Sequence, residues 1–291
     1  MLPNKELNAL FSLIDDPDEE VFHVISKRII TYGREILPRL EDLCETTLDD
    51  KTQSRISEII RQVNFDNLIS ELQLWNAERT HDLLIGSHLI ASYCYPDLSL
   101  DCLRRNVDHL EREIWLETNN FLTSLETATV VTRVMFQIEK FESERNNYQH
   151  MEHFCLHSIL EKKKGNAIST GILYQHICES LDIPIKLIDI PDQHILACFQ
   201  RGFLNHTDNA GHESQILFYI DAATGRLFSH KDLDVYFEQY QIPKKDCYFK
   251  PLSHQHIISH LASEVGKCFL ANRQLDRKKD LDQIAALLTK A

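Results

Sequence analysis

Residues 160–199 read LEKKKGNAISTGILYQHICESLDIPIKLIDIPDQHILACF, and this stretch decides the fold. Ile168 to Leu181 has the pattern of a buried helix, and the proline of Asp182-Ile183-Pro184 ends it. Two runs rich in β-branched residues follow, IKLIDI at 185–190 and ILACF at 195–199, and Pro191 separates them. The stretch therefore predicts a helix followed by two antiparallel strands.

The pattern continues toward the C-terminus. Residues 201–214 contain Asn, Asp, Gly and His and are typical of a hairpin loop, and ILFYI at 216–220 predicts a third strand. DAATG at 221–225 is typical of a turn, and 228–240 returns to a helical pattern with Ser229 as its expected N-cap. Two or three further helices are expected over residues 255–288.

The N-terminal half has a different texture. From residue 4 to about 140 the apolar residues recur at helical spacing, with separate helices expected at 56–63 and 68–75 among others. Residues 13–43, LIDDPDEEVFHVISKRIITYGREILPRLEDL, are similar to one HEAT-type helical repeat. The expected fold class is α+β, mostly α, with an all-helical domain at 1–145, a core with a small antiparallel sheet at 146–250 and a C-terminal helical segment at 251–291.

Composition excludes several classes of function. A formal net charge of −13 argues against binding nucleic acid through its phosphates. The first ten residues, MLPNKELNAL, lack a secretory pattern, and no apolar run approaches the roughly 18 residues of a membrane span. The eight cysteines form no CxxC pair, so free thiols in a reducing compartment are expected. The chain is predicted to be cytoplasmic, with no membrane association.

An ordered set of motifs resembles the transglutaminase-like superfamily, in the branch typified by the SirB-type invasion-regulator proteins of bacteria. The matching positions include Leu160-Glu161, Gly165, Leu173-Tyr174 and Pro184, and later FYIDAATGRLFS at 218–229. This resemblance implies a thiol-protease-like core between variable helices. It also implies no metal. No cofactor is expected either, because neither GxxxxGK[ST] nor GxGxxG occurs in the sequence.

The resemblance implies a thiol chemistry that this chain lacks the group to perform. A cysteine at a helix N-terminus would attack an acyl group, a histidine on the next strand would activate it, and an aspartate on the following strand would orient that histidine. The first turn of the 168–181 helix has no cysteine, because its residues 166–171 are NAISTG. A displaced nucleophile would have to be Cys155, Cys178 or Cys198, close to His194.

Two residues compete for the histidine position. Alignment on Pro191 places Gln193 where the family has histidine, and a shift in the preceding turn restores His194. Because adjacent side chains of a strand point to opposite faces, this choice matters. Asp221 aligns with the family aspartate, where it either orients a histidine or bonds the backbone of its own turn. Both His194 and Asp221 are vestigial catalytic candidates.

The remaining candidates belong to the same site. Ala167, Ser169, Thr170 and Gln193 are expected to line the old active-site groove. Ser169 and Thr170 are poor replacements for a thiol, because a hydroxyl needs a well-placed base and an oxyanion hole, and a capping role is expected instead.

Two groups of histidines resemble metal ligands in spacing alone: His150, His153 and His157, and a second group at 254, 256 and 260. Neither carries a His-Glu-x-x-His pattern, so no metal site is predicted. The sequence favours a non-catalytic module that binds a protein or small-molecule partner of unknown identity. A thiol enzyme with a displaced nucleophile and a structural helical-repeat adaptor are the alternatives.

Overall fold

The computed structural model describes residues 4–78, 81–119, 121–145, 147–202 and 211–289. Contacts between Cα atoms divide the chain into two compact units, Met1–Leu74 and Trp75–Ala291. The domain boundary expected at residue 145 lies inside the second unit. The expected hairpin loop at 201–214 lies largely outside the described residues.

The first unit consists of helices. They are α1 (Asn4–Phe11), α2 (Glu19–Ile30), the 3-10 helix η1 (Gly33–Ile36), α3 (Leu37–Thr46) and most of α4 (Asp50–Ala77). Their apolar faces form one core in which Leu7, Ile29 and Leu40 are completely buried. Arg55 is also buried in this core, where its guanidinium donates to the backbone carbonyl of Ile14 at 2.8 Å.

Helix α4 is continuous where two separate helices were expected. The residues between the expected helices, Asn64 to Asn67, include weak helix formers but neither proline nor glycine. Phe65 of this segment is buried, so it continues the apolar face. Packing therefore carries the helix through the segment.

In the part of the second unit that the structure describes, the strands form two small sheets. Strands β1 (Glu142–Glu144) and β2 (Lys164–Asn166) pair in parallel. The other sheet is antiparallel with the strand order β3-β4-β5-β6, and its members are β3 (Ile185–Ile190), β4 (Gln193–Phe199), β5 (Ile216–Asp221) and β6 (Leu227–Phe228). The three strands predicted from the sequence are confirmed, and so is their antiparallel pairing.

Helices surround these sheets. The α-helices are α5 (Leu83–Cys94), α6 (Leu100–Glu117), α7 (Ser124–Thr132), α8 (Leu156–Lys162), α9 (Ala167–Ser180), α10 (His230–Gln239), α11 (His254–Ala271) and α12 (Leu275–Thr289). Shorter helical turns are the π-helix η2 (Arg133–Ile138) and the 3-10 helices η3 (Met151–Phe154), η5 (His212–Gln215) and η6 (Asp246–Phe249). Ser229 caps α10 as expected.

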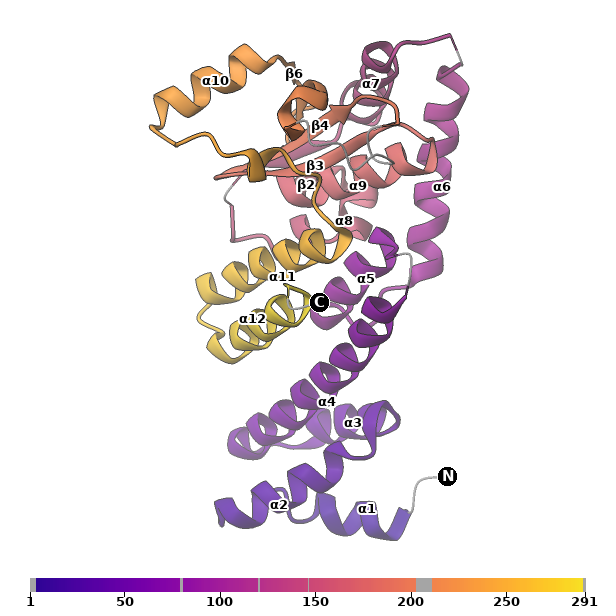
Figure 1. The fold of residues 1–291 in the computed structure, drawn as a ribbon. Coiled ribbons are helices and arrows are strands. Elements are labelled where there is room, and N and C mark those ends of the chain that lie inside the picture. Colours follow the sequence, from indigo (N-terminus) through magenta and orange to yellow (C-terminus); the bar gives the residue numbers. More distant parts are fainter. Residues whose placement is uncertain (1–3, 79–80, 120, 146, 203–210, 290–291) are drawn as a thin grey trace. The chain divides into compact units, whose positions relative to one another are not determined.

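The two faces of the four-stranded sheet are covered by different helices (Figure 1). Helix α9 packs against one face, where a Cβ at Gly171 would lie 3.0 Å from the side chain of Leu187. Helix α10 packs against the other, where Leu233 and Phe237 join a core with Ile195. Residues of β4 therefore meet α9 or α10 according to whether their number is even or odd.

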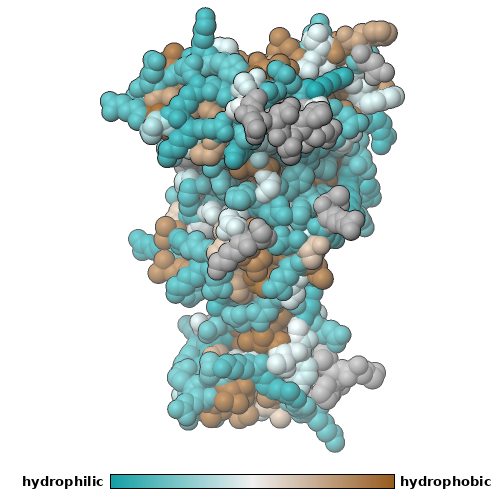
Figure 2. Space-filling model, in the orientation of Figure 1, coloured by the Kyte–Doolittle hydropathy of each residue, from teal (hydrophilic) through white to brown (hydrophobic). Residues whose placement is uncertain are grey.

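The second unit ends in an antiparallel helix pair, α11 and α12 (yellow in Figure 1). The pair packs partly on α5, where a Cβ at Gly86 would lie 2.7 Å from Ile258. The observed fold is α+β and mostly helical, as predicted. Hydrophilic residues cover most of the face shown in Figure 2, in keeping with the net charge of −13. None of the described helices is long and apolar enough to cross a membrane.

Candidate functional site

The first turn of α9 is the place where the family chemistry would put a nucleophile. In this chain the side chains of that turn cap the N-terminus of the helix instead. The side chain of Asn166, the N-cap, accepts from the backbone N–H of Ile168 at 3.1 Å. The backbone N–H of Asn166 in turn donates to Oγ of Ser169 at 3.1 Å, which completes a capping box. Ser169 also donates to the carbonyl of His153 at 2.7 Å. The predicted capping role of Ser169 is therefore confirmed.

The other residues of this turn are equally enclosed. Ala167 is 2% exposed, and Ser169 and Thr170 are both 0% exposed. The hydroxyl of Thr170 shares a hydrogen bond with the hydroxyl of Ser143, at the neighbouring strand β1. Among the residues of this turn, Ile168 lines a cavity. An acyl substrate would meet no hydroxyl here.

His194 lies on the sheet face that α9 covers. It pairs with Asp189 across β3 and β4, and it lines a cavity of about 190 Å³ together with Ile168. Burial lowers the pKa of the His194 imidazole, and the nearby carboxylate of Glu264 opposes that shift. The imidazole is thus held neutral near physiological pH, which is the state that a general base requires.

Helix α11 borders this cavity, and its polar side chains meet Tyr148 from the segment before η3. The hydroxyl of Tyr148 donates to Oε2 of Glu264 at 2.9 Å, and Nζ of Lys267 donates to Oε1 at 2.6 Å. His260, from the same helix, also lines the cavity. The space beside His194 is therefore polar and small, with room for about six water molecules.

Gln193 and Asp221 lie on the opposite face of the sheet. Asp221 pairs with Ile195 across β4 and β5, so its side chain points to the α10 side. One terminal nitrogen of Arg145 forms an ion pair with Oδ2 of Asp221, and the other donates to Oε1 of Gln193 at 3.0 Å. These groups line a second cavity of about 290 Å³, which Tyr236 also reaches.

Asp221 is further occupied by its own turn. Its Oδ1 accepts from the backbone N–H of Ala223 at 2.9 Å, and its Oδ2 accepts from Thr224 at 2.9 Å. Of the two roles that the sequence left open for Asp221, these contacts match the turn role. The structure thus places His194 and Asp221 on adjacent strands, with their side chains on opposite faces of the sheet.

Arg145 is the site residue that sequence reasoning missed. It follows β1, and the pairing of β1 with β2 brings it next to the start of α9. A single arginine after a three-residue strand matches no motif. The charge of Asp221 was the available signal, because a half-buried carboxylate needs a cationic partner.

The cysteines considered as displaced nucleophiles are protonated. Burial raises the pKa of the Cys198 thiol to about 12, and it also raises the pKa values of Cys178 and Cys155. Cys198 lies four residues from His194 along β4, which corresponds to about 13 Å between Cα atoms. The sulfur of Cys155 lies 3.7 Å from Nδ1 of a different histidine, His157.

The two histidine groups do not form a metal centre. Residues 150–157 are not one helix, because η3 ends at Phe154 and α8 begins at Leu156. The rings of His150 and His153 lie 5.0 Å apart, whereas His157 packs against His88 with 5.3 Å between ring centroids. Within the described ranges, no three His, Cys, Asp or Glu side chains are arranged to hold a metal ion.

Comparison with known proteins gives one clear result. The model of the transglutaminase-like superfamily matches residues 102–263, which is more than half of the chain and includes α9 and the four-stranded sheet. No curated protein and no solved structure matches the chain. The chain belongs to the transglutaminase-like superfamily.

Proposed function

We propose that this protein is a non-catalytic member of its superfamily, which binds a partner through the old active-site region. The observation that carries the proposal is the first turn of α9. It lacks a sulfur, its two hydroxyl groups are fully buried, and Ser169 is consumed by the capping box. A nucleophile is the one group that acyl transfer by a thiol mechanism cannot omit.

The positions of the other two family residues support the same conclusion. An aspartate that orients a histidine must reach its imidazole, but Asp221 lies across the sheet from His194 and is ion-paired with Arg145. A displaced thiol is disfavoured because burial keeps Cys155, Cys178 and Cys198 protonated.

The cavities favour binding over a purely structural role. A structural adaptor has no use for an open site, yet about 190 Å³ beside His194 and about 290 Å³ beside Arg145 remain unfilled by side chains. The first cavity offers a neutral imidazole, a carboxylate and an ammonium group. These groups suit a small polar group, such as one side chain of a partner protein.

An activity measurement tests the proposal. The purified full chain is incubated with casein and a fluorescent primary amine, and both amine incorporation and casein cleavage are followed. We expect neither reaction above the buffer control, and no effect of prior alkylation with iodoacetamide. Turnover that is lost in His194→Ala or Asp221→Ala, while both variants keep the native circular dichroism spectrum, would refute the proposal.

A further inference from the structure

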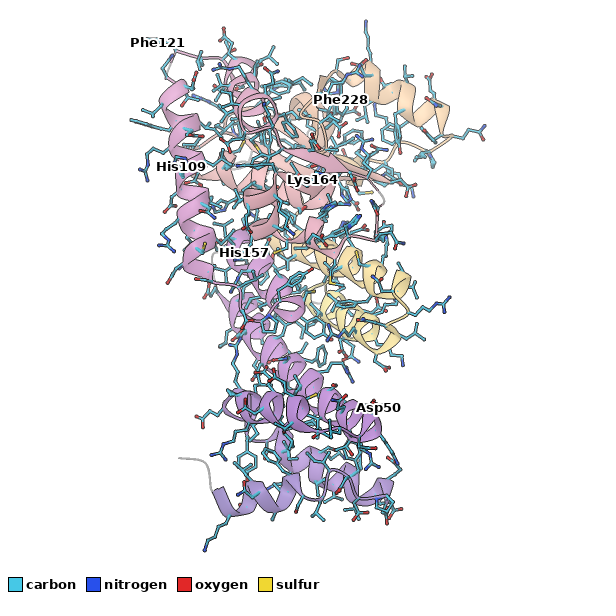
Figure 3. The ribbon with its side chains drawn as sticks, turned by 180° about the vertical axis from the view of Figure 1, so that it is seen from behind. Asp50, His109, Phe121, His157, Lys164 and Phe228 are labelled. Atoms are coloured by element: carbon cyan, nitrogen blue, oxygen red, sulfur yellow. The ribbon has the colours of Figure 1, made fainter. Side chains whose placement is uncertain are left out.

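The cavity of about 290 Å³ beside Arg145 combines apolar side chains with charged ones. Ile195 of β4 and Leu233 of α10 belong to the buried core between the sheet and that helix. Phe228 of β6 and Tyr236 of α10 add two aromatic rings, and Figure 3 shows Phe228 beside α10. An apolar cavity of about 150 Å³ is large enough to bind benzene, so this cavity has room for an aromatic ring.

Contacts behind the two aromatic walls hold them in place. The hydroxyl of Tyr236 donates to the carbonyl of Pro191 at 2.8 Å, and its ring lies 4.8 Å from the ring of Tyr240. The ring of Phe228 stacks on Tyr219, with 5.5 Å between centroids and 21° between planes. A ligand would therefore enter a cavity whose walls are already ordered, which lowers the entropic cost of binding.

The charged side chains of this cavity balance one another. Of the described residues, two arginines and two aspartates line it. Asp221 is ion-paired with Arg145, and its backbone N–H donates to the carbonyl of Arg226, its cross-strand neighbour. The carboxylate of Asp232 accepts from the backbone and the hydroxyl of Ser229 in the capping box of α10. Because neither sign of charge is in surplus, the cavity favours a neutral occupant over an anion or a cation.

Arg145 favours an aromatic occupant over an aliphatic one. Its guanidinium donates to Gln193 and Asp221, and hydrogen bonds of this kind lie in the plane of the group. They leave the two faces of the guanidinium unused, and such a face stacks favourably on an aromatic ring. The side chain lines the cavity and is 45% exposed, so a ring inside the cavity can approach it.

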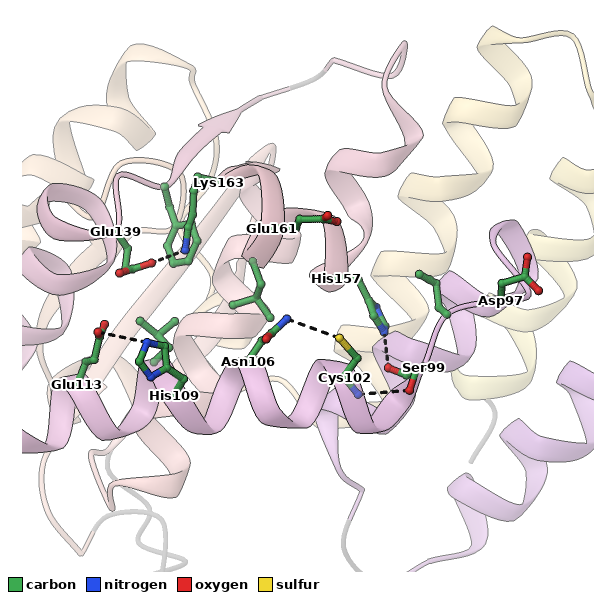
Figure 4. Close-up of a pocket in the computed structure, with 14 residues that line it drawn as sticks. Asp97, Ser99, Cys102, Asn106, His109, Glu113, Glu139, His157, Glu161 and Lys163 are labelled. Carbon is green, nitrogen blue, oxygen red and sulfur yellow. Dashed lines mark hydrogen bonds and ion pairs between the residues drawn. The ribbon is translucent and has the colours of Figure 1, made fainter.

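A second cavity, of about 560 Å³ along α6 and α8, lacks these features (Figure 4). None of the described residues that line it is an arginine. Its polar side chains pair with one another, Glu139 with Lys163 and Glu113 with His109. The ring of Phe141 already faces Nζ of Lys163, at 4.8 Å from the ring centroid. An aromatic ligand is therefore expected beside Arg145 and not along α6.

We propose that the cavity beside Arg145 receives an aromatic side chain of the partner protein, phenylalanine or tyrosine, which stacks on the guanidinium of Arg145. The source is a side chain and not a free compound. Arg145 is partly exposed and Phe228 is half-buried, so the cavity opens to solvent and the backbone that carries the ring can stay outside. This inference rests on the proposed function, because it names the group of the partner that enters the site.

Methyl NMR spectra of the full chain locate the ring. The chain is labelled with carbon-13 at its isoleucine and leucine methyl groups and titrated with N-acetyl-phenylalanine amide. We expect ring-current shifts at Ile195 and Leu233, with a Kd on the order of 1 mM for a ligand of this size. Leu187, in the cavity beside His194, should not shift. Absence of shifts at Ile195 and Leu233, or shifts at Leu187 alone, would overturn the proposal.

Matched ligands test the chemistry of the ring. N-acetyl-cyclohexylalanine amide has a similar shape but no π system, and it should bind about threefold more weakly. N-acetyl-lysine amide and N-acetyl-glutamate amide should bind more weakly still, because the cavity has no surplus charge. Binding by any of these three that equals the phenylalanine ligand contradicts the aromatic assignment. p-Cresol tests the source: if it binds and neither the capped phenylalanine nor the capped tyrosine does, the assignment to a side chain is wrong.

Variants connect the binding to the cavity. Arg145→Gln should weaken the phenylalanine ligand about threefold and leave the cyclohexyl ligand unchanged. Arg133→Gln removes an arginine that pairs with Glu117 outside the cavity and should change neither affinity. Tyr236→Ala removes a wall and should weaken both ligands about fivefold, whereas Val235→Ala, an exposed neighbour on α10, should weaken neither. Unchanged affinities in Arg145→Gln and Tyr236→Ala, with thermal melts showing that both are folded, would refute the proposal.

The inference and the proposed function fail in different experiments. Turnover in the casein assay refutes the proposed function, and the methyl titration does not depend on turnover. Missing ring-current shifts in a chain without turnover overturn the aromatic assignment and leave the proposed function standing.

Discussion

Glu179 on α9 holds together three parts of the second unit, and its substitution tests that arrangement. Its Oε1 lies 2.9 Å from Nε2 of His254 at the start of α11, and Lys186 on β3 forms an ion pair with the same oxygen. Nδ1 of His254 faces the carbonyl of His81. Because both ring nitrogens of His254 face acceptors, these contacts favour the doubly protonated, charged imidazole.

The pKa values define the pH range in which this network is stabilising. Burial acts to raise the pKa of Glu179, but hydrogen bonds and charge from His254 and Lys186 outweigh it and lower the pKa from 4.5 to about 2. Its contribution is complete above pH 4.5 and is lost as the pH falls toward 2. Burial opposes the charge of His254, yet the contacts with Glu179 raise its pKa above 6.5, so its contribution is lost as the pH rises through that raised value. The network is therefore strongest between about pH 4.5 and 6.5.

The size of the effect follows from the same numbers. Lowering the pKa of Glu179 from 4.5 to about 2 means that folding stabilises the ionised carboxylate by roughly 3 kcal/mol relative to the neutral carboxyl. The side chain is 21% exposed, and solvent screening reduces the expected loss for Glu179→Gln to about 2 kcal/mol at pH 6. In this variant His254 loses its carboxylate, so the part of the stability change between pH 6 and pH 8 that comes from His254 should disappear.

Urea unfolding followed by tryptophan fluorescence measures this loss. Both tryptophans, Trp75 and Trp115, belong to the second unit, so the signal reports on that unit. Asp276→Asn is the matched control. It removes the ion pair between Asp276 and Lys279, whose side chains are both exposed, and should cost less than about 0.5 kcal/mol. A loss below 0.5 kcal/mol for Glu179→Gln at pH 6, or an NMR-measured pKa of His254 at or below 6.5, would refute the reasoning.

Three further predictions concern local structure. Gly225→Ala should lower the free energy of unfolding by roughly 3 kcal/mol, because φ at Gly225 is +68° and the added Cβ would lie 2.5 Å from the ring of Phe136. Gly202→Ala is the control: φ is +89° but the space around it is open, so it should cost only about 1 kcal/mol in the same urea titration. Ser169→Ala should cost about 1–2 kcal/mol, since it removes the Ser169 half of the α9 capping box and the hydrogen bond to His153, and a circular dichroism melt with no change in midpoint would contradict this. Ellman's reagent should label Cys102 and Cys247 in the native protein, whereas the four buried cysteines should react only in denaturant; rapid native labelling of a buried thiol would contradict the burial argument.

Local pattern was enough to predict the elements around the site. The strands at 185–190 and 216–220 are bounded by proline, aspartate and glycine and are rich in β-branched residues, and the structure contains both. Ser229 was identified as a cap because its hydroxyl precedes a helical pattern. These features depend on neighbours within a few residues, which is the range over which sequence pattern is informative.

Features set by distant residues were not predictable in the same way. The helices expected at 56–63 and 68–75 form one helix, because the buried side chain of Phe65 outweighs the weak propensities around it. Arg145 reaches Asp221 and Gln193 across 76 and 48 residues of sequence. A contact of that kind depends on how β1 is placed beside β2, and no local signal in the sequence records that placement.

The alternation of side chains along β4 links the sequence problem to the chemistry. Sequence alone left a choice between Gln193 and His194, and a strand can present just one of two neighbours to α9. The strand register turns His194 to the α9 face, whereas the side chain of Gln193 accepts from Arg145, the ion-pair partner of Asp221. An aligned histidine and an aligned aspartate therefore do not make a catalytic pair here, because their strands turn them to opposite sides. Adding a cysteine to the first turn of α9 would therefore still leave His194 without Asp221 as the carboxylate that orients it.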